Sequence, residues 1–75
     1  MIHYKIDVIK QLSEAGYTSP VLRERKLLSQ ATLQNIREGK NINTSTLNTI
    51  CLLLRKKVED IIEVIPTDEE KIKFF

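Results

Sequence analysis

The sequence is poor in the residues on which most catalytic and metal-binding sites depend. Its 75 residues include one histidine, one cysteine, two glycines and two prolines. His3 has no cluster of cysteines or acids around it to complete a metal site, and Cys51 has no second histidine to activate it as a nucleophile. Both glycines lie at the ends of predicted helices, so none is left for a phosphate-binding loop. We therefore expect neither an enzyme nor a cofactor or metal site.

Long apolar segments are also missing. No run approaches the roughly 18 residues that a membrane span needs, and no charged and then apolar leader opens the sequence. A lone cysteine cannot form an internal disulfide, which agrees with a reducing compartment. These features predict a cytoplasmic protein without membrane contact. At 75 residues we expect one domain, which is too small to build a walled cleft for a small-molecule substrate.

Charge is unevenly distributed along the chain. Residues 1–58 hold ten Lys or Arg against four Asp or Glu, whereas residues 59–75 hold two Lys against six acids. A basic body with an acidic tail is compatible with a polyanionic partner bound by the body. An ordinary solvated surface would show the same asymmetry by chance, and charge alone does not choose between the two.

One short pattern occurs three times and predicts three helix starts. An apolar residue precedes a capping residue, and a second apolar residue follows five positions after the first. The three sets are Tyr17, Thr18 and Leu22; Leu28, Ser29 and Leu33; and Ile42, Asn43 and Leu47. In this arrangement the capping side chain accepts from the free N–H groups of the first turn, while the two apolar residues pack together.

The predicted fold is all-α, with five helices. Gly16 and Gly39 follow helical segments at the position where a left-handed backbone ends a helix, and Pro20 lies in a first turn, where it is tolerated. The helices are predicted at about 4–15, 19–25, 30–38, 44–54 and a short segment from 58, with residues 63–66 as a brief extended stretch. The predicted inward positions are Val8, Ile9, Leu12, Val21, Leu22, Leu33, Ile36, Leu47, Ile50, Cys51, Leu54, Val58, Ile61, Ile62 and Ile65.

The second and third predicted helices are joined by only three residues, which is typical of a helix-turn-helix unit. From Ile2 to Pro66 the sequence resembles the small Cro/cI-type (Xre-like) helix-turn-helix regulators of phages and bacteria. The resemblance lies in "GYTSPVLRERKLLSQATLQNIREGKNINTSTLNTICLLL" and "VEDIIEVIP". It implies a compact, five-helix, lambda-repressor-like domain over 1–66, and a sequence-specific regulator that docks helix 30–38 in the DNA major groove.

The third helix carries the residue types that such a role needs. With Leu33 and Ile36 held in the core, the helix turns an amide-rich face outward, and Asn and Gln suit adenine while Ala suits a thymine methyl. The expected base-reading residues are Gln30, Ala31, Thr32, Gln34 and Asn35. The expected phosphate contacts are Ser19, Ser29, Arg37, Lys40, Asn41 and Asn43. The partner expected from this set is double-stranded DNA.

Three residues depart from the family pattern, and they leave open an alternative to DNA binding. Leu27 stands in the turn where members often carry glycine, Arg23 stands where many have a small residue, and Glu38 would repel a phosphate. A left-handed backbone at Leu27 would cost on the order of 1 kcal/mol, and its side chain would be left beside the third helix. The alternative is a protein-interaction module, such as an antirepressor or antitoxin-like partner, that covers another repressor through this face.

Residues 67–75 form a short acidic and then apolar tail. Both phenylalanines of the chain, Phe74 and Phe75, are found in it. Terminal residues are disordered by default, but this use of both phenylalanines favours docking, either onto the same chain or onto another subunit. Leu27, Phe74 and Phe75 are therefore candidate protein-interface residues. A two-fold homodimer would also suit a helix-turn-helix reader.

Overall fold

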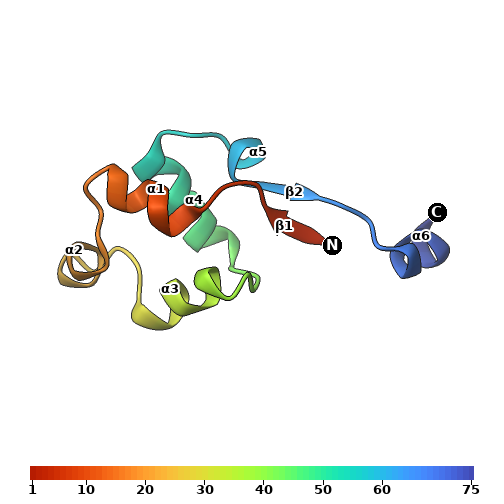
Figure 1. Cartoon of the computed structure of the whole chain (residues 1–75), viewed down its shortest axis with the longest axis horizontal. Coiled ribbons are helices and arrows are strands. Elements are labelled where there is room, and N and C mark those ends of the chain that lie inside the picture. The colour runs from red at the N-terminus through yellow and green to blue at the C-terminus, as the bar shows by residue number, and fades with distance from the viewer.

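The computed structural model describes all residues 1–75 and contains six helices and a two-stranded sheet (Figure 1). The helices are α1 (Val8–Glu14), α2 (Ser19–Glu24), α3 (Gln30–Arg37), α4 (Thr44–Leu54), α5 (Val58–Ile61) and α6 (Asp68–Phe74), and the strands are β1 (Ile2–Tyr4) and β2 (Ile62–Val64). The mostly helical prediction is therefore confirmed, with one sheet and one helix more than expected. None of the helices has the length and apolar character that a membrane crossing requires.

The three helix starts marked by the repeated pattern are confirmed. Thr18, Ser29 and Asn43 are the N-cap residues of α2, α3 and α4. The Ser29 hydroxyl accepts a hydrogen bond from the backbone N–H of Thr32 at 3.1 Å, and Asn43 Oδ1 accepts one from Thr46 at 2.7 Å. Thr18 has the same extended backbone but makes no side-chain capping bond. Its role is therefore confined to backbone geometry and to the packing of its neighbours.

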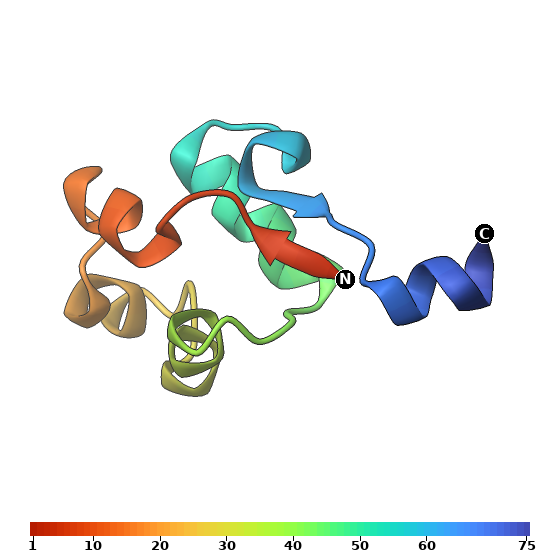
Figure 2. The same cartoon turned by 45° about the vertical axis from the view of Figure 1, so that its right-hand side comes forward.

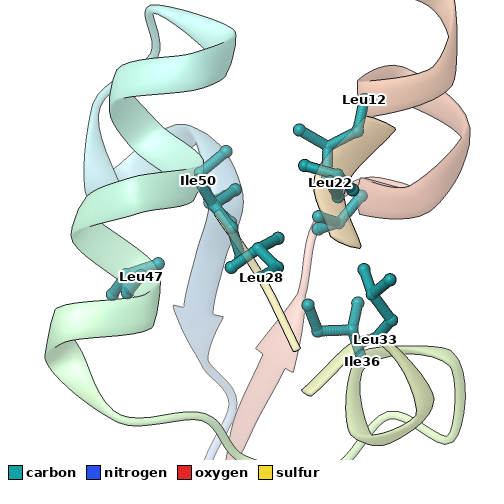
Figure 3. Close-up of a cluster of buried hydrophobic side chains, with 9 residues drawn as sticks. Leu12, Leu22, Leu28, Leu33, Ile36, Leu47 and Ile50 are labelled. Atoms are coloured by element: carbon teal, nitrogen blue, oxygen red, sulfur yellow. The ribbon is translucent and has the colours of Figure 1, made fainter. Parts of the chain in front are cut away.

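The core is one apolar cluster formed by residues of α1 to α5 and of the loop between α2 and α3. Its nine buried residues are Val8, Leu12, Leu22, Leu28, Leu33, Ile36, Leu47, Ile50 and Ile61, and most of them are labelled in Figure 3. Leu22, Leu28, Leu33 and Leu47 all come from the helix-start pattern, so the residues that begin the helices also anchor them to one another. Helix α1 packs against both α3 and α4, and α2 packs against α3. Cys51 and Leu54 lie partly buried against this cluster, as predicted.

The predicted start of the first helix at Tyr4 is wrong. Residues Ile2–Tyr4 form β1, which pairs antiparallel with β2 in the register Ile2 with Val64 and Tyr4 with Ile62. Helix α1 begins only at Val8, because Asp7 caps it by accepting from the N–H of Lys10 at 3.2 Å. The sheet lies beside α5 at the side of the domain away from α2, as Figures 1 and 2 show.

The last apolar segment is also shorter than predicted. Helix α5 ends at Ile61, and the chain then turns into β2, so the extended stretch expected at 63–66 is found slightly earlier. Ile61 is buried and Ile62 is half-buried, but Val58 and Ile65 are 51% and 49% exposed. Their predicted inward positions are wrong: Val58 is the first residue of the short helix α5, and Ile65 follows β2, where helical spacing no longer applies.

The tail forms a helix of its own. Thr67 caps α6 by accepting from the N–H of Glu70, and the Glu70 carboxylate accepts in return from the N–H of Thr67. Helix α6 has no buried residue, and Figure 2 shows it standing apart from the helical body, beyond the end of the sheet. Phe74 and Phe75 are 70% and 86% exposed, so in this chain the tail does not fold back onto the domain.

Candidate nucleic-acid interface

Helix α3 is fixed to the domain by one face and leaves the opposite face free. Leu33 and Ile36 are buried in the core, and Ser29 caps the first turn. Helix α3 ends at Arg37, and Gly39, just past the cap residue, has a φ of +72°. Its N–H reaches the carbonyl of Ile36, and the N–H of Lys40 reaches that of Asn35. Hydrogen bonds therefore cap both ends of α3. The helix holds its outward-pointing side chains in fixed positions relative to the core.

The turn between α2 and α3 is left-handed at Lys26 and not at Leu27. Lys26 has a φ of +55°, and it occupies the position just past the helix end where glycine is usual. The N–H of Leu27 bonds to the carbonyl of Leu22 at 2.9 Å, and the Leu27 side chain is half-buried against the core. The expectation of strain and of an exposed side chain at Leu27 is wrong: the strain is one residue earlier, and Leu27 packs inward.

The predicted base-reading residues fall into two groups by exposure. Gln30, Ala31 and Gln34 are exposed, whereas Thr32 and Asn35 are only partly exposed. The Thr32 hydroxyl also accepts a hydrogen bond from Ser29 at 2.9 Å, which ties it to the helix cap. Gln30, Ala31 and Gln34 are therefore the members of the set that a ligand reaches most easily.

The two glutamine amides are held in defined orientations. Arg23 on α2 donates to Gln30 Oε1 at 3.2 Å, and Gln34 donates through Nε2 to Glu38 Oε1 at 3.3 Å. A guanidinium has only donors and a carboxylate only acceptors, so each partner decides which end of the amide faces it. Gln30 thus keeps both N–H donors free, while Gln34 keeps its carbonyl oxygen free.

The predicted phosphate-binding residues are partly engaged within the protein. Arg37 donates to the Ser19 hydroxyl at 2.9 Å and so links the end of α3 to the start of α2. Lys40 lies 3.1 Å from the Glu38 carboxylate, so the negative charge of Glu38 is balanced locally. The remaining three are Ser29 and Asn43, which act as helix caps, and Asn41, which is exposed in the loop after α3.

The helix-turn-helix is rich in exposed positive charge. Its two helices and their flanking loops carry five exposed cations, against the two acids Glu24 and Glu38. The cations are Arg23, Arg25, Lys26, Arg37 and Lys40. The Arg25 guanidinium lies over the ring of Tyr17, 6.0 Å from its centroid. This surface favours a polyanion.

Two residues with a part in this site were not assigned one from the sequence. Arg23 was treated only as a departure from the family pattern, but it orients Gln30. The Tyr4 hydroxyl donates to the carbonyl of Lys40 at 2.7 Å and braces the loop after α3 from β1. Burial raises the pKa of Tyr4 above its ordinary value. The sequence gives no local signal for a contact between residues 36 positions apart.

Comparison with family models matches residues 7–67 to the Cro/C1-type HTH DNA-binding domain. The matched segment runs from the cap of α1 to the residue before α6, and it includes the whole helix-turn-helix. No match was found among curated proteins or among solved structures. The match covers most of the chain and agrees with the resemblance found in the sequence. The chain therefore belongs to the Cro/C1-type helix-turn-helix DNA-binding domain family.

Proposed function

We propose that this protein is a sequence-specific transcriptional regulator of the repressor type, which binds double-stranded DNA through α3. The helix would lie in the major groove, and occupancy would block a promoter by steric exclusion. Such a regulator works in the compartment that holds the DNA, which in a bacterial cell is the cytoplasm. The domain over 1–66 is proposed to supply the whole DNA-binding surface.

The single observation that carries this proposal is the pair of oriented glutamines on the exposed face of α3. Gln30 offers N–H donors and Gln34 offers a carbonyl acceptor, and adenine presents an acceptor at N7 and a donor at N6 in the major groove. Ala31, exposed between them, suits a thymine methyl. Amides already held by Arg23 and Glu38 lose less side-chain freedom on binding than free ones would.

Phosphate contacts would set the register of the helix on the duplex. Arg23 on α2, Arg37 on α3 and Lys40 in the loop after it are all exposed. Arg37 donates to Ser19, and Lys40 pairs with Glu38. Each cation has further N–H donors, which a phosphate oxygen could accept. Ser19, Ser29, Asn41 and Asn43 are proposed as secondary contacts from loops and helix starts.

One observation argues against the alternative, in which the protein is a module that covers another repressor protein. This alternative used Leu27 as an exposed apolar contact, but that side chain packs against the core. The exposed part of α3 is instead polar, and a protein interface of this class would be expected to have an apolar centre. We therefore place DNA ahead of a protein partner for this face.

The test is to recover preferred sites from a pool of random duplexes and then measure two variants on the best site. Gln30→Ala and Gln34→Ala should each weaken binding by roughly tenfold or more, because each good base contact contributes about 1–3 kcal/mol. The loss should be smaller on duplexes that differ at the contacted base pair. Asn48→Ala is the matched control, since it removes an exposed amide from α4 that is not among the proposed contacts.

The design separates DNA reading from simple electrostatic attraction. If no site is enriched, or if the two glutamine variants behave like Asn48→Ala, the proposed role of α3 is wrong. If the enriched site binds equally well after both substitutions but is lost in Arg37→Ala, the protein holds DNA without reading it through these amides, which also contradicts the proposal.

A further inference from the structure

A hollow lies on the surface of the protein at the turn between α2 and α3. It has a volume of about 260 Å³ and is lined by Arg23, Lys26, Leu28 and Ser29. Leu28 is buried in the core, whereas the other three residues are exposed. The volume is several times the roughly 30 Å³ that one water molecule takes up in the liquid, so a group of the size of a phosphate fits in this hollow.

The lining of the hollow carries two positive charges and no negative one. Neither Arg23 nor Lys26 forms an ion pair within the protein. Arg23 uses one donor, at Nη1, on the Oε1 atom of Gln30, which leaves the other N–H groups of its guanidinium free for a ligand. The Lys26 ammonium brings three more donors, and both groups are typical ligands of phosphate oxygens. The hollow therefore favours an anion.

The backbone fixes the two cations at the hollow. The N–H of Lys26 donates to the carbonyl of Arg23 at 3.1 Å, and Lys26 then takes its left-handed φ of +55°. Arg55 has the same φ at the end of α4, but it lines no hollow of the protein. The left-handed backbone alone thus does not mark a binding site, and the hollow is what distinguishes Lys26 from Arg55.

The hollow adjoins the end of α3 that is proposed to read bases. Ser29 lines the hollow and caps α3, and Gln30, the first residue of α3, accepts the hydrogen bond from Arg23. When a recognition helix lies in the major groove, the sugar-phosphate backbones border it on either side. The anions within reach of this hollow are then the phosphates of the duplex.

We propose that the hollow at the α2–α3 turn holds one phosphate of the DNA backbone, bound by Arg23 and Lys26. The inference rests on the docking of α3 on DNA proposed above, but not on base reading by Gln30 and Gln34. It gives Lys26 a function, and it gives Arg23 two contacts at once, one to the phosphate and one to the Gln30 amide. This contact fixes the start of α3 on the duplex without reading its sequence.

The first experiment compares Lys26→Gly with Arg55→Gly by fluorescence anisotropy, on the preferred duplex and on a scrambled one, between about 50 and 200 mM salt. Each variant loses one exposed positive charge and one left-handed side chain, so both should melt at or above the wild-type temperature. Arg55 is the matched control because the loop after α4 lies on the opposite side of the domain from α3 (Figures 1 and 2).

Lys26→Gly should weaken binding by the same factor on both duplexes. It should also reduce the slope of the logarithm of affinity against the logarithm of salt by about 0.9, the value for one phosphate. The advantage of the wild type over this variant should accordingly shrink by roughly threefold between 50 and 200 mM salt. Arg55→Gly should change neither the affinity nor the slope.

A second experiment identifies the phosphate. Single phosphates of the duplex are replaced by neutral methylphosphonates, and the loss of affinity is measured at each position. At one position the loss should be smaller for Lys26→Gly and for Arg23→Ala than for the wild type, because each variant already lacks part of that contact. Arg55→Gly should show the full wild-type loss there.

The outcomes separate this inference from base reading by α3. If Lys26→Gly binds like Arg55→Gly, or if no position of the scan responds to both Arg23 and Lys26, the phosphate site is wrong while base reading stands. If the wild type binds both duplexes equally but Lys26→Gly shows the expected loss and slope, the phosphate site is supported and base reading is contradicted. A wild type that binds neither duplex at low salt overturns both.

Discussion

At the scale of single residues, the backbone at Lys26 is a clear conflict between sequence and fold. A left-handed φ is unfavourable for a residue with a Cβ atom, yet the turn between α2 and α3 requires it at this position. Two of the other three helix ends with a left-handed residue, at Gly16 and Gly39, use glycine, and the third, Arg55 after α4, has the same φ of +55° as Lys26. Lys26 therefore keeps a positive charge in the helix-turn-helix at the expense of some stability.

Lys26→Gly should stabilise the domain by about 1 kcal/mol, because it removes the left-handed strain that a side chain imposes. In a domain of this size that corresponds to a rise in melting temperature of roughly 4–8 °C, measurable by circular dichroism. Gly39→Ala is the reciprocal control and should lower stability by a similar amount. No neighbouring atom lies within 4 Å of a Cβ placed at Gly39, so its effect reports the backbone conformation and not a steric clash. A Lys26→Gly variant less stable than the wild type would contradict this account.

At the scale of elements, the helix starts differ in a way that the sequence pattern does not reveal. Asn43 makes a side-chain capping bond to Thr46, whereas Thr18 makes none, although both stand at an N-cap. Asn43→Ala should therefore lower the free energy of unfolding by about 1 kcal/mol. Thr18→Ala should lower it by clearly less. The measurement is urea unfolding of both variants and of the wild type. Equal decreases in the free energy of unfolding would contradict the difference between the two caps.

The connection between α6 and the sheet should depend on pH. The hydrogen bond from the N-terminal ammonium and that from the N–H of Thr67 lower the pKa of Glu70 from 4.5 to about 2. Since the folded-state pKa lies below the ordinary value, this stabilising contribution is complete above about pH 4.5 and is lost as the pH falls through about 2. A carboxylate carbon titration of Glu70 by NMR should show its midpoint near 2.

The control for this titration is Glu70→Gln, which keeps the side-chain shape but cannot titrate. In that variant the resonances of Met1 and Thr67 should no longer respond to pH between about 4.5 and 2. A Glu70 midpoint close to 4.5 in the wild type would show that the contact with the Met1 ammonium does not form in solution.

Elements that are specified by neighbouring residues could be predicted from the sequence. Elements that depend on pairing between residues far apart in the sequence could not. The starts of α2, α3 and α4 follow from neighbouring residues, and so do the helix ends at Gly16 and Gly39. Strand β1 has only three residues and exists because residues 2–4 meet residues 62–64, which no local pattern indicates. Helix α6 is different, because Thr67 and Glu70 show the spacing of a capping box and so carry a local signal for a helix start.

At the scale of the whole molecule, two surfaces lie in different regions. The helix-turn-helix carries oriented amides and exposed cations, whereas the sheet end and the tail carry most of the exposed large apolar residues and most of the acids of residues 59–75. The family and the positive surface could be predicted from the sequence. The orientation of Gln30 by Arg23 could not, because it depends on how α2 and α3 are packed together.

The most direct test of the central claim is a fluorescence-anisotropy titration of the protein against the duplex upstream of its own gene and against a scrambled duplex. It should be run at low and at physiological salt. A regulator that reads DNA through α3 should prefer the native duplex at both salt concentrations, with an affinity that falls steeply as salt rises, because phosphate contacts release counterions. Equal, weak and sequence-independent binding to both duplexes would contradict the claim.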